Sequence, residues 1–146
     1  MLNHALILIL LLVPQALGPS ARSTPGAAEE RHYPTLVYAE VPLYPPLALT
    51  AHISGTVEIE ITVENGTVIL AQVKSSGFPG DAALTNPSLG NIQKWKFRPE
   101  PRTTFLVTFI YEIRGEQTDL PENPKVELDL PKLVRVTARP FKPTIT

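Results

Sequence analysis

The chain has 146 residues, with 13 Lys and Arg against 14 Asp and Glu, so its formal net charge is −1. This length suits one domain with tails, and the near-neutral charge without a long basic run argues against nucleic acid as a partner. Cysteine is absent, which excludes disulfides, thiolate metal sites and a cysteine nucleophile.

The N-terminus carries an unbroken apolar run, Ala5 to Val13, followed by Pro14 and several small residues. A membrane-spanning helix needs about 20 apolar residues, so the shorter run is typical of a secretory signal peptide with its cleavage zone. We therefore predict a cleaved signal peptide at residues 1–21 and a periplasmic or secreted mature protein. If the segment is retained, it would anchor the chain in the inner membrane.

Residues 22–43 are predicted to be a linker, because Pro25, Pro34 and Pro42 are spaced through them. One short extended piece is expected inside this linker, at Leu36–Ala39. The Pro45-Pro46 pair then suits the start of a helix, since proline at the first helical position loses no needed N–H. That helix is predicted to run for about two turns, from Leu47 to Ile53, before Gly55.

A strand is predicted at Thr56–Glu64, where apolar and polar residues alternate without a fault. Asn65-Gly66 is a strong hairpin signal, because both residues tolerate the positive φ of a type I′ turn. The returning strand needs one extra residue near Ile69-Leu70 to bring Ala71 and Val73 onto the apolar face, which predicts a β-bulge. Asn65-Gly66-Thr67 is also formally a glycosylation sequon, but the tight turn explains the same residues better.

A second helix is predicted at Pro87–Lys96, capped by Asn86, with Leu89, Ile92 and Trp95 along one face. A turn at Asp81–Leu84 would precede it. The third strand is predicted at Thr103–Ile113, whose odd-numbered residues form an aromatic and apolar face. One core cluster should contain Val57, Ile59, Ile61, Val63, Trp95, Phe97, Phe105, Val107 and Phe109.

The C-terminal residues 115–146 are predicted to be a loop and an extended tail, with a loop over Gly115–Lys125 and one more strand at Lys132–Ala138. Pro131 argues against a central position for any strand that spans it. The sequence leaves open whether this tail strand pairs with the third strand. The order of elements predicts an α+β two-layer sandwich, a small antiparallel β-β-α-β sheet plus a tail strand with a short N-terminal helix, over a domain at residues 44–114.

The mature sequence offers little for catalysis or metal binding. His32 and His52 have no second His or Cys at ligand spacing, and Glu58, Glu60 and Glu64 fit a solvated strand face. Ser75-Ser76-Gly77 lacks the glycine pattern of a nucleophile elbow and fits a turn. We therefore predict no enzyme activity, no metal and no cofactor.

The ordered combination of YPPLA, IxGTV, the Asn-Gly turn, SSG and WKFRP resembles the C-terminal domain of the TonB family of energy transducers. The resemblance covers about Val41 to Ile113, and it implies an α/β fold and a role in carrying inner-membrane energy to outer-membrane transporters. The matching positions are Tyr44, Pro45, Pro46, Leu47, Ala48, Ile53, Gly55, Val57, Val63, Gly66, Val68, Val73, Ser75, Ser76, Gly77, Trp95, Phe97 and Pro99.

The resemblance also implies a binding site, because the family receives a transporter's peptide at a sheet edge of this kind. In this chain the third strand would supply that edge, with a bound strand flanked by Thr104, Leu106, Thr108, Ile110 and Glu112. The expected partner is a protein, either an outer-membrane transporter peptide or another envelope protein. The alternative is a stand-alone envelope adaptor or structural protein without energy coupling.

Overall fold

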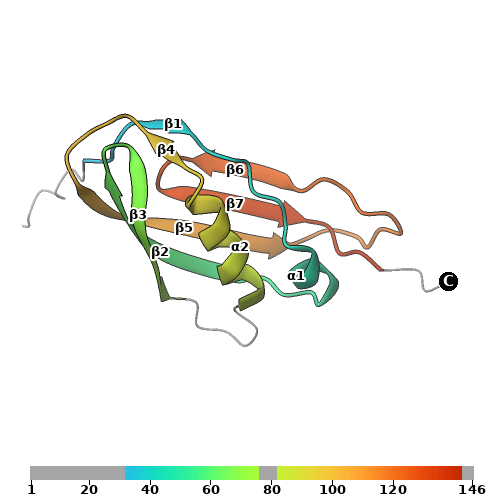
Figure 1. The fold of residues 1–146 in the computed structure, drawn as a ribbon. Helices are drawn as coiled ribbons and strands as arrows, with labels where there is room; N and C mark the ends of the chain where they lie inside the picture. The colour runs from blue at the N-terminus through green and yellow to red at the C-terminus, as the bar shows by residue number, and fades with distance from the viewer. Residues whose placement is uncertain (1–31, 76–81, 143–146) are drawn as a thin grey trace, which may run out of the picture. The chain divides into compact units, whose positions relative to one another are not determined.

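The computed structural model describes residues 32–75 and 82–142, and its strands form one seven-stranded sheet in the order β1-β4-β3-β2-β5-β7-β6 (Figure 1). The expectations for residues 1–31 and for Ser76–Asp81 lie outside the described residues. Together with two helices, the sheet confirms the predicted α+β class. The elements in chain order are β1 (Leu36–Tyr38), α1 (Pro46–Thr50), β2 (Gly55–Glu64), β3 (Thr67–Ser75), α2 (Ala82–Ile92), β4 (Lys96–Phe97), β5 (Thr103–Ile113), β6 (Lys125–Asp129) and β7 (Leu133–Ala138).

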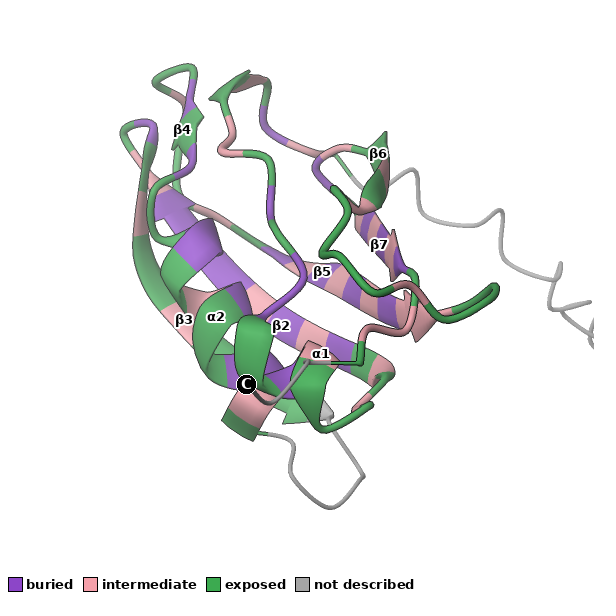
Figure 2. Ribbon diagram, turned by 90° about the vertical axis from the view of Figure 1, so that its right-hand side faces the viewer, coloured by how far each residue is buried: buried purple, intermediate pink, exposed green. Residues whose placement is uncertain are grey.

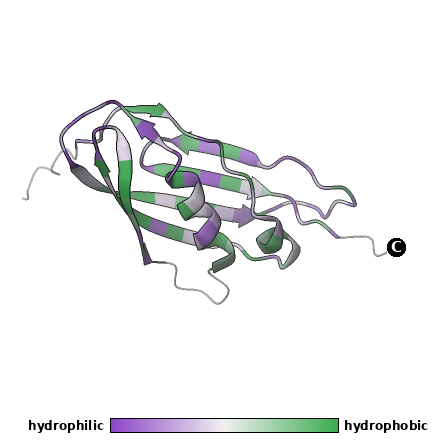
Figure 3. Cartoon of the chain, viewed as in Figure 1, coloured by the Kyte–Doolittle hydropathy of each residue, from purple (hydrophilic) through white to green (hydrophobic). Residues whose placement is uncertain are grey.

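The centre of the sheet is the pairing of β2 with β5. These two strands are antiparallel and stay in register from Gly55 opposite Tyr111 to Val63 opposite Thr103. Burial alternates along both strands, as Figure 2 shows by the repeated change of colour, and the apolar face is the buried one. The alternation in hydropathy follows the same period (Figure 3). The predictions for both strands are confirmed.

The hairpin between β2 and β3 has the predicted turn, with φ of 49° at Asn65 and 80° at Gly66. The predicted bulge is also present, because Val63 lies opposite Val68 whereas Thr62 lies opposite Leu70. A second irregularity, between Glu58 and Ile59 of β2, was not predicted. The predicted bulge keeps Val68, Ala71 and Val73 packed against the core, whereas Ile69 and Leu70 are each 46% exposed.

Helix α1 begins at Pro46, within the proline pair that was predicted to start it, but it ends at Thr50, earlier than the predicted Ile53. The chain leaves the helix through His52, which has a left-handed φ of 52°. The N–H of Ile53 donates to the carbonyl of Ala48 at 2.7 Å, and the N–H of His52 donates to that of Leu49 at 3.2 Å. This is a Schellman ending, in which a histidine takes the position that glycine usually fills.

The predicted start and end of the second helix are wrong. Helix α2 spans Ala82–Ile92, so Pro87 lies inside it and not at its first position. An internal proline costs about 3 kcal/mol because it removes one helical hydrogen bond, and here packing overrides that cost. The buried residues of α2 are Leu84, Thr85, Ser88, Asn91 and Ile92. The chain then turns after Ile92, and Lys96–Phe97 form β4, which pairs with β1.

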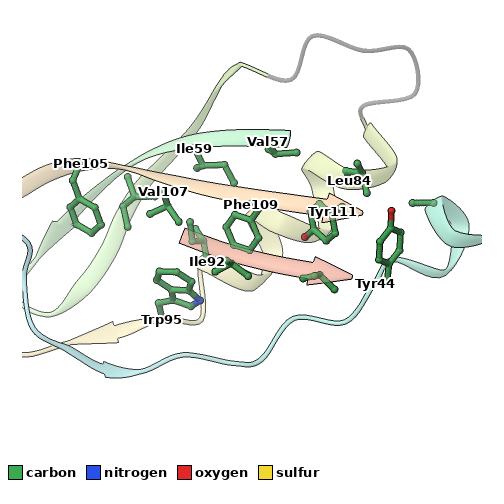
Figure 4. Packing of buried hydrophobic residues seen from close by; sticks show 14 of the residues in the cluster. Tyr44, Val57, Ile59, Leu84, Ile92, Trp95, Phe105, Val107, Phe109 and Tyr111 are labelled. Carbon is green, nitrogen blue, oxygen red and sulfur yellow. The ribbon is translucent and has the colours of Figure 1, made fainter. Parts of the chain in front are cut away.

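All nine predicted core residues are buried in one cluster, together with residues from α1, α2 and β7. Figure 4 shows Trp95 beside Ile92 and Phe109, with Tyr111 facing Tyr44. The rings of Trp95 and Phe109 have centroids 6.3 Å apart. Trp95 Nε1 donates a 2.9 Å hydrogen bond to Asn91 Oδ1, and Asn91 Nδ2 donates one of 3.0 Å to the Glu40 carbonyl. The buried indole N–H of Trp95 and the side chain of Asn91 therefore both have hydrogen-bond partners.

The tail forms a hairpin at the end of the sheet, and it changes two predictions. Strand β6 was missed, because only one strand, Lys132–Ala138, was predicted after the loop over Gly115–Lys125. Strand β7 agrees with the predicted tail strand but is parallel to β5, so the sheet is mixed and not antiparallel. The parallel direction arises because β6 runs back along the sheet before the turn that contains Pro131, and β7 then enters between β5 and β6.

Candidate strand-pairing edge

Strand β5 holds the five residues that the sequence assigned to a partner-binding edge. They alternate with the buried residues of β5, so they share the face of the sheet that is turned away from the core, and none of them is fully buried. They are Thr104, Leu106, Thr108, Ile110 and Glu112. One side of β5 is paired with β2 from Thr103 to Tyr111, so any further strand along these residues must pair on the other side.

The first half of β5 has no strand in register on that other side among the described residues. Thr104 and Leu106 are paired only towards β2, and Thr104 Oγ1 lies 2.9 Å from Thr62 Oγ1. The linker passes close by, since the ring of Tyr33 packs edge-on against Phe105 with centroids 5.5 Å apart. The first half of β5 is therefore a short stretch of edge, and the contact between Tyr33 and Phe105 lies beside it.

The second half of β5 is already paired with β7, and its residues 108–111 are paired with β2 as well. Thr108, Ile110 and Glu112 lie opposite Leu133, Arg135 and Thr137 of β7, and the parallel register continues to Ile113 opposite Ala138. The structure therefore adopts the alternative in which the tail strand pairs with the third strand. Over this half, β5 is an interior strand and not an edge.

Hydrogen bonds at both ends fix the position of β7 on β5. The N–H of Thr108 donates to the carbonyl of Lys132 at 2.8 Å, and the N–H of Arg114 donates to that of Ala138 at 2.9 Å. The inward side chains of β7 are buried, with Val134 and Val136 at 0% exposure and Ala138 at 4%. The tail strand is thus part of the core and does not merely lie along the sheet.

The residues after β7 also hold the tail in place. Arg139 Nε donates to the carbonyl of Glu116 at 3.1 Å, and Arg139 Nη1 lies 3.0 Å from Glu122 Oε1. The N–H of Thr118 donates to the carbonyl of Pro140 at 2.9 Å. The loop between β5 and β6 is therefore tied to the end of β7.

Charges on the hairpin are paired at its surface. Lys125 Nζ lies 2.7 Å from Glu127 Oε1, and Arg135 Nε lies 3.9 Å from Glu127 Oε2. The hydrogen bond from Lys125 holds the pKa of the Glu127 carboxyl below its usual value, and Arg135 acts in the same direction. Exposed pairs of this kind contribute little to stability, but charges on an outer strand discourage further edge pairing.

Two tyrosine hydroxyls near the end of β5 are structural. Burial raises the pKa of Tyr111 to about 12, against the opposing effect of a hydrogen bond with Ser88, whose Oγ lies 2.8 Å from the Tyr111 hydroxyl. Burial also raises the pKa of Tyr44, which donates a 2.7 Å hydrogen bond to the Ile53 carbonyl. Both phenols therefore stay neutral at physiological pH. The Tyr111 hydroxyl joins β5 to α2, and the Tyr44 hydroxyl joins the chain before α1 to Ile53 after it.

A groove of about 510 Å³ lies between the linker and α2, next to these tyrosines. It is lined mainly by apolar side chains, and an ion pair of 2.6 Å between Lys94 Nζ and Glu40 Oε2 lies among the lining residues. In residues 32–75 and 82–142 we find no group of three or more His, Cys, Asp or Glu side chains that could hold a metal ion.

The remaining polar residues from the sequence are dispersed. His32 Nε2 lies 3.2 Å from Glu100 Oε2, and Glu60 Oε1 lies 3.1 Å from Lys74 Nζ. His52 is exposed at the end of α1. Most of the Ser75-Ser76-Gly77 turn lies outside the described residues. The structure does not bring these groups together into one site.

The fold and this edge define an α+β domain whose sheet pairs with an added strand at β5. The family model described as "Gram-negative bacterial TonB protein C-terminal" matches residues 40–114, and the chain belongs to this family. The resemblance seen in the sequence is therefore confirmed. The family comprises non-catalytic energy-transducer and protein-interaction domains. No curated protein matches the chain. Among the described residues, no helix is long and apolar enough to cross a membrane.

Proposed function

We propose that the chain is a TonB-like protein-binding domain of the periplasm that receives an extended strand from a partner at β5. The observation that carries the proposal is the parallel pairing of β5 with β7 from Thr108 to Ile113. It supports the proposal because a strand of about six residues fits there with both its backbone and its inward side chains accommodated. Added strands gain affinity from backbone hydrogen bonds and specificity from alternate side chains.

The finer form of this proposal is energy transduction to outer-membrane transporters. A transporter peptide would then take the place of β7 and lie along Thr108, Ile110 and Glu112, with Thr104 and Leu106 extending the site. In this form the two-layer layout keeps the helices on one face of the sheet and leaves the end beside β5 for the partner. Residues 1–21 would act as a signal peptide, which mass spectrometry of the mature N-terminus would test.

A second candidate is a stand-alone envelope adaptor without energy coupling. It is favoured by the burial of Val134, Val136 and Ala138, because a tail strand that completes the core is costly to remove. In that case the β5 position stays closed, and partners would bind elsewhere on the domain.

A reversible lock on the tail separates these two functions. The chain has no cysteine, so Ile110→Cys with Arg135→Cys, which are neighbours across β5 and β7, would give a single disulfide that holds β7 in place. Binding of synthetic peptides from transporter N-termini would be measured by fluorescence anisotropy before and after reduction. The strand-receiving function predicts binding only in the reduced form.

A matched control is Glu127→Cys with Arg135→Cys, which joins β6 to β7 and leaves β7 free to leave β5. This variant should bind the peptides in both redox states. Equal binding by the oxidised and reduced forms of the β5–β7 variant would favour the adaptor with a site elsewhere. Absence of binding in every form would contradict strand reception from transporters.

A further inference from the structure

The hairpin of β6 and β7 is an addition to the family domain. The family model ends at residue 114, directly after β5, and the hairpin begins at Lys125. Among the strands that the structure describes, β7 pairs with β5 of the rest of the domain, whereas β6 pairs with β7 alone. Strand β7 therefore pairs with β5 as a strand of a bound peptide would, except that a loop joins the hairpin covalently to β5.

The inward side of β7 shows which side chains the β5 position accepts. Val134 lies opposite Phe109, Val136 opposite Tyr111, and Ala138 opposite Ile113. Val134 and Val136 have no exposed surface, and Ala138 is 4% exposed. Close-packed positions of this kind tolerate small β-branched or small residues, whereas larger side chains overpack them and charged ones would be buried without a partner.

The outward side of β7 is less restrictive. Leu133, Arg135 and Thr137 are only partly buried, and Arg135 approaches Glu127 no closer than 3.9 Å. Substitutions there change surface contacts and not core packing, so they should alter affinity weakly. The direction is restricted, however, because the terminal hydrogen bonds from Thr108 and Arg114 fit a parallel strand.

We propose that the hairpin is an internal ligand of the β5 position, and that the partner recognised there is a parallel strand with small β-branched residues at two alternate inward positions and a small residue at the third. This inference rests on the proposed function and adds the chemistry of its partner. The loop that joins β5 to β6 is short, residues 114–124, so the internal strand has an effective concentration on the order of 1 mM. A free peptide of equal intrinsic affinity at about 10 μM would then displace it in roughly 1% of molecules.

The proposal is tested by cutting the loop while keeping the whole chain. A protease site at Leu120, which is 75% exposed, allows the hairpin fragment to dissociate after cleavage. The probe is a fluorescein-labelled peptide with the sequence of residues 131–140, and its binding is followed by anisotropy. We expect the cleaved protein to bind the peptide at least 100-fold more tightly than the uncleaved protein.

Peptide variants test the predicted chemistry. Replacing both Val134 and Val136 by Asp should weaken binding at least 100-fold, and a peptide with the reversed sequence should not bind. Replacing Arg135 by Gln should change binding less than threefold. Equal binding of the inward and outward variants, or of the reversed peptide, would overturn the proposal.

A second measurement tests the proposal in case the cleaved protein unfolds. The uncleaved chain with Val136→Asp should be destabilised, and the wild-type peptide should raise its thermal midpoint while the peptide with two Asp should not. No effect of the peptide on either protein would overturn the internal-ligand proposal. If the tail peptide binds but transporter peptides do not, the proposal stands and the transporter function fails. If transporter peptides bind equally well before and after cleavage, their site lies elsewhere and the strand-receiving function fails, whereas the internal-ligand proposal is decided by the tail peptide.

Discussion

The β2–β5 pair at the centre of the sheet and the β6–β7 hairpin at its end use the same alternating pattern with different consequences. The inward residues of β2 and β5 are enclosed by α2 and by strands on both sides (Figure 2). In the hairpin, the inward residues of β7 are buried, but β6 is mostly exposed and pairs only with β7. The centre therefore stabilises the whole domain, whereas the hairpin is stabilised through one strand and should open separately.

The largest effect should come from removing the central aromatic ring. Trp95 is 1% exposed and contacts Phe97 and Phe109. Trp95→Ala should lower the free energy of unfolding by about 3–5 kcal/mol, because it leaves a large cavity. Urea unfolding monitored by circular dichroism measures the change. An unchanged midpoint would show that the ring does not stabilise the core.

The next effect concerns two glycines in the family-matched part of the chain. A Cβ at Gly66 would lie 2.4 Å from the Phe97 carbonyl oxygen, and its φ is +80°, whereas a Cβ at Gly90 has no neighbour within 4 Å. Gly66→Ala should therefore cost about 1–3 kcal/mol. Gly90→Ala should instead stabilise the domain by up to about 1 kcal/mol, because it lies inside α2.

Thermal unfolding of the two glycine variants provides the check, and each serves as the control for the other. Opposite shifts of the midpoint are expected. Shifts of the same sign would mean that the close approach of Phe97 to the turn does not determine the stability of this hairpin.

Most of the structure that could be predicted followed from local sequence patterns. The alternation at Thr56–Glu64 and Thr103–Ile113 and the Asn65-Gly66 turn fixed three strands, and the need to keep Val73 inward predicted the bulge. The start of α2 was missed because proline favours the first position of a helix, and Pro87 was therefore predicted to be that position. The buried positions of Ser88 and Asn91 depend on hydrogen-bond partners that are distant in sequence. Such partners cannot be read from spacing alone.

The pairing of the tail could be expected only in part. The alternation in Lys132–Ala138 predicted a strand, but its parallel direction depends on β6, whose alternation is hidden by exposed charged residues. The sequence could name Thr108, Ile110 and Glu112 as residues beside an added strand. Whether the chain itself would supply that strand is a competition between burying Val134 and Val136 and ordering a loop, which sequence patterns do not resolve.

A pair of substitutions in the hairpin sharpens the comparison between its two strands. Val134 and Leu128 lie opposite each other, but Val134 is 0% exposed and Leu128 is 46% exposed. Val134→Ala should cost about 2 kcal/mol, and Leu128→Ala less than about 1 kcal/mol. Hydrogen exchange should show faster opening of β7 than of β2 in the unmodified chain. Simultaneous opening of β2 and β7 would contradict a separately stabilised hairpin.

The smallest effect should be the pH dependence of two surface carboxylates, Glu100 before β5 and Glu127 in the hairpin. Hydrogen bonds hold the pKa of Glu100 below its ordinary value of 4.5 through His32, and that of Glu127 through Lys125. A carboxyl whose pKa is depressed by folding contributes stability above its unfolded pKa, and this contribution is lost as the pH falls through the folded pKa. Glu100→Gln and Glu127→Gln should each therefore reduce stability slightly at pH 7 and converge with the unmodified chain well below pH 4.5. Because both groups are exposed, the differences in stability should also shrink in high salt.

Hydrogen exchange shows which strands are affected, and Glu127→Gln should affect the amides of β6 and β7 without altering those of β2. A change that spreads equally to β2 would show that the hairpin and the centre of the sheet unfold as one unit.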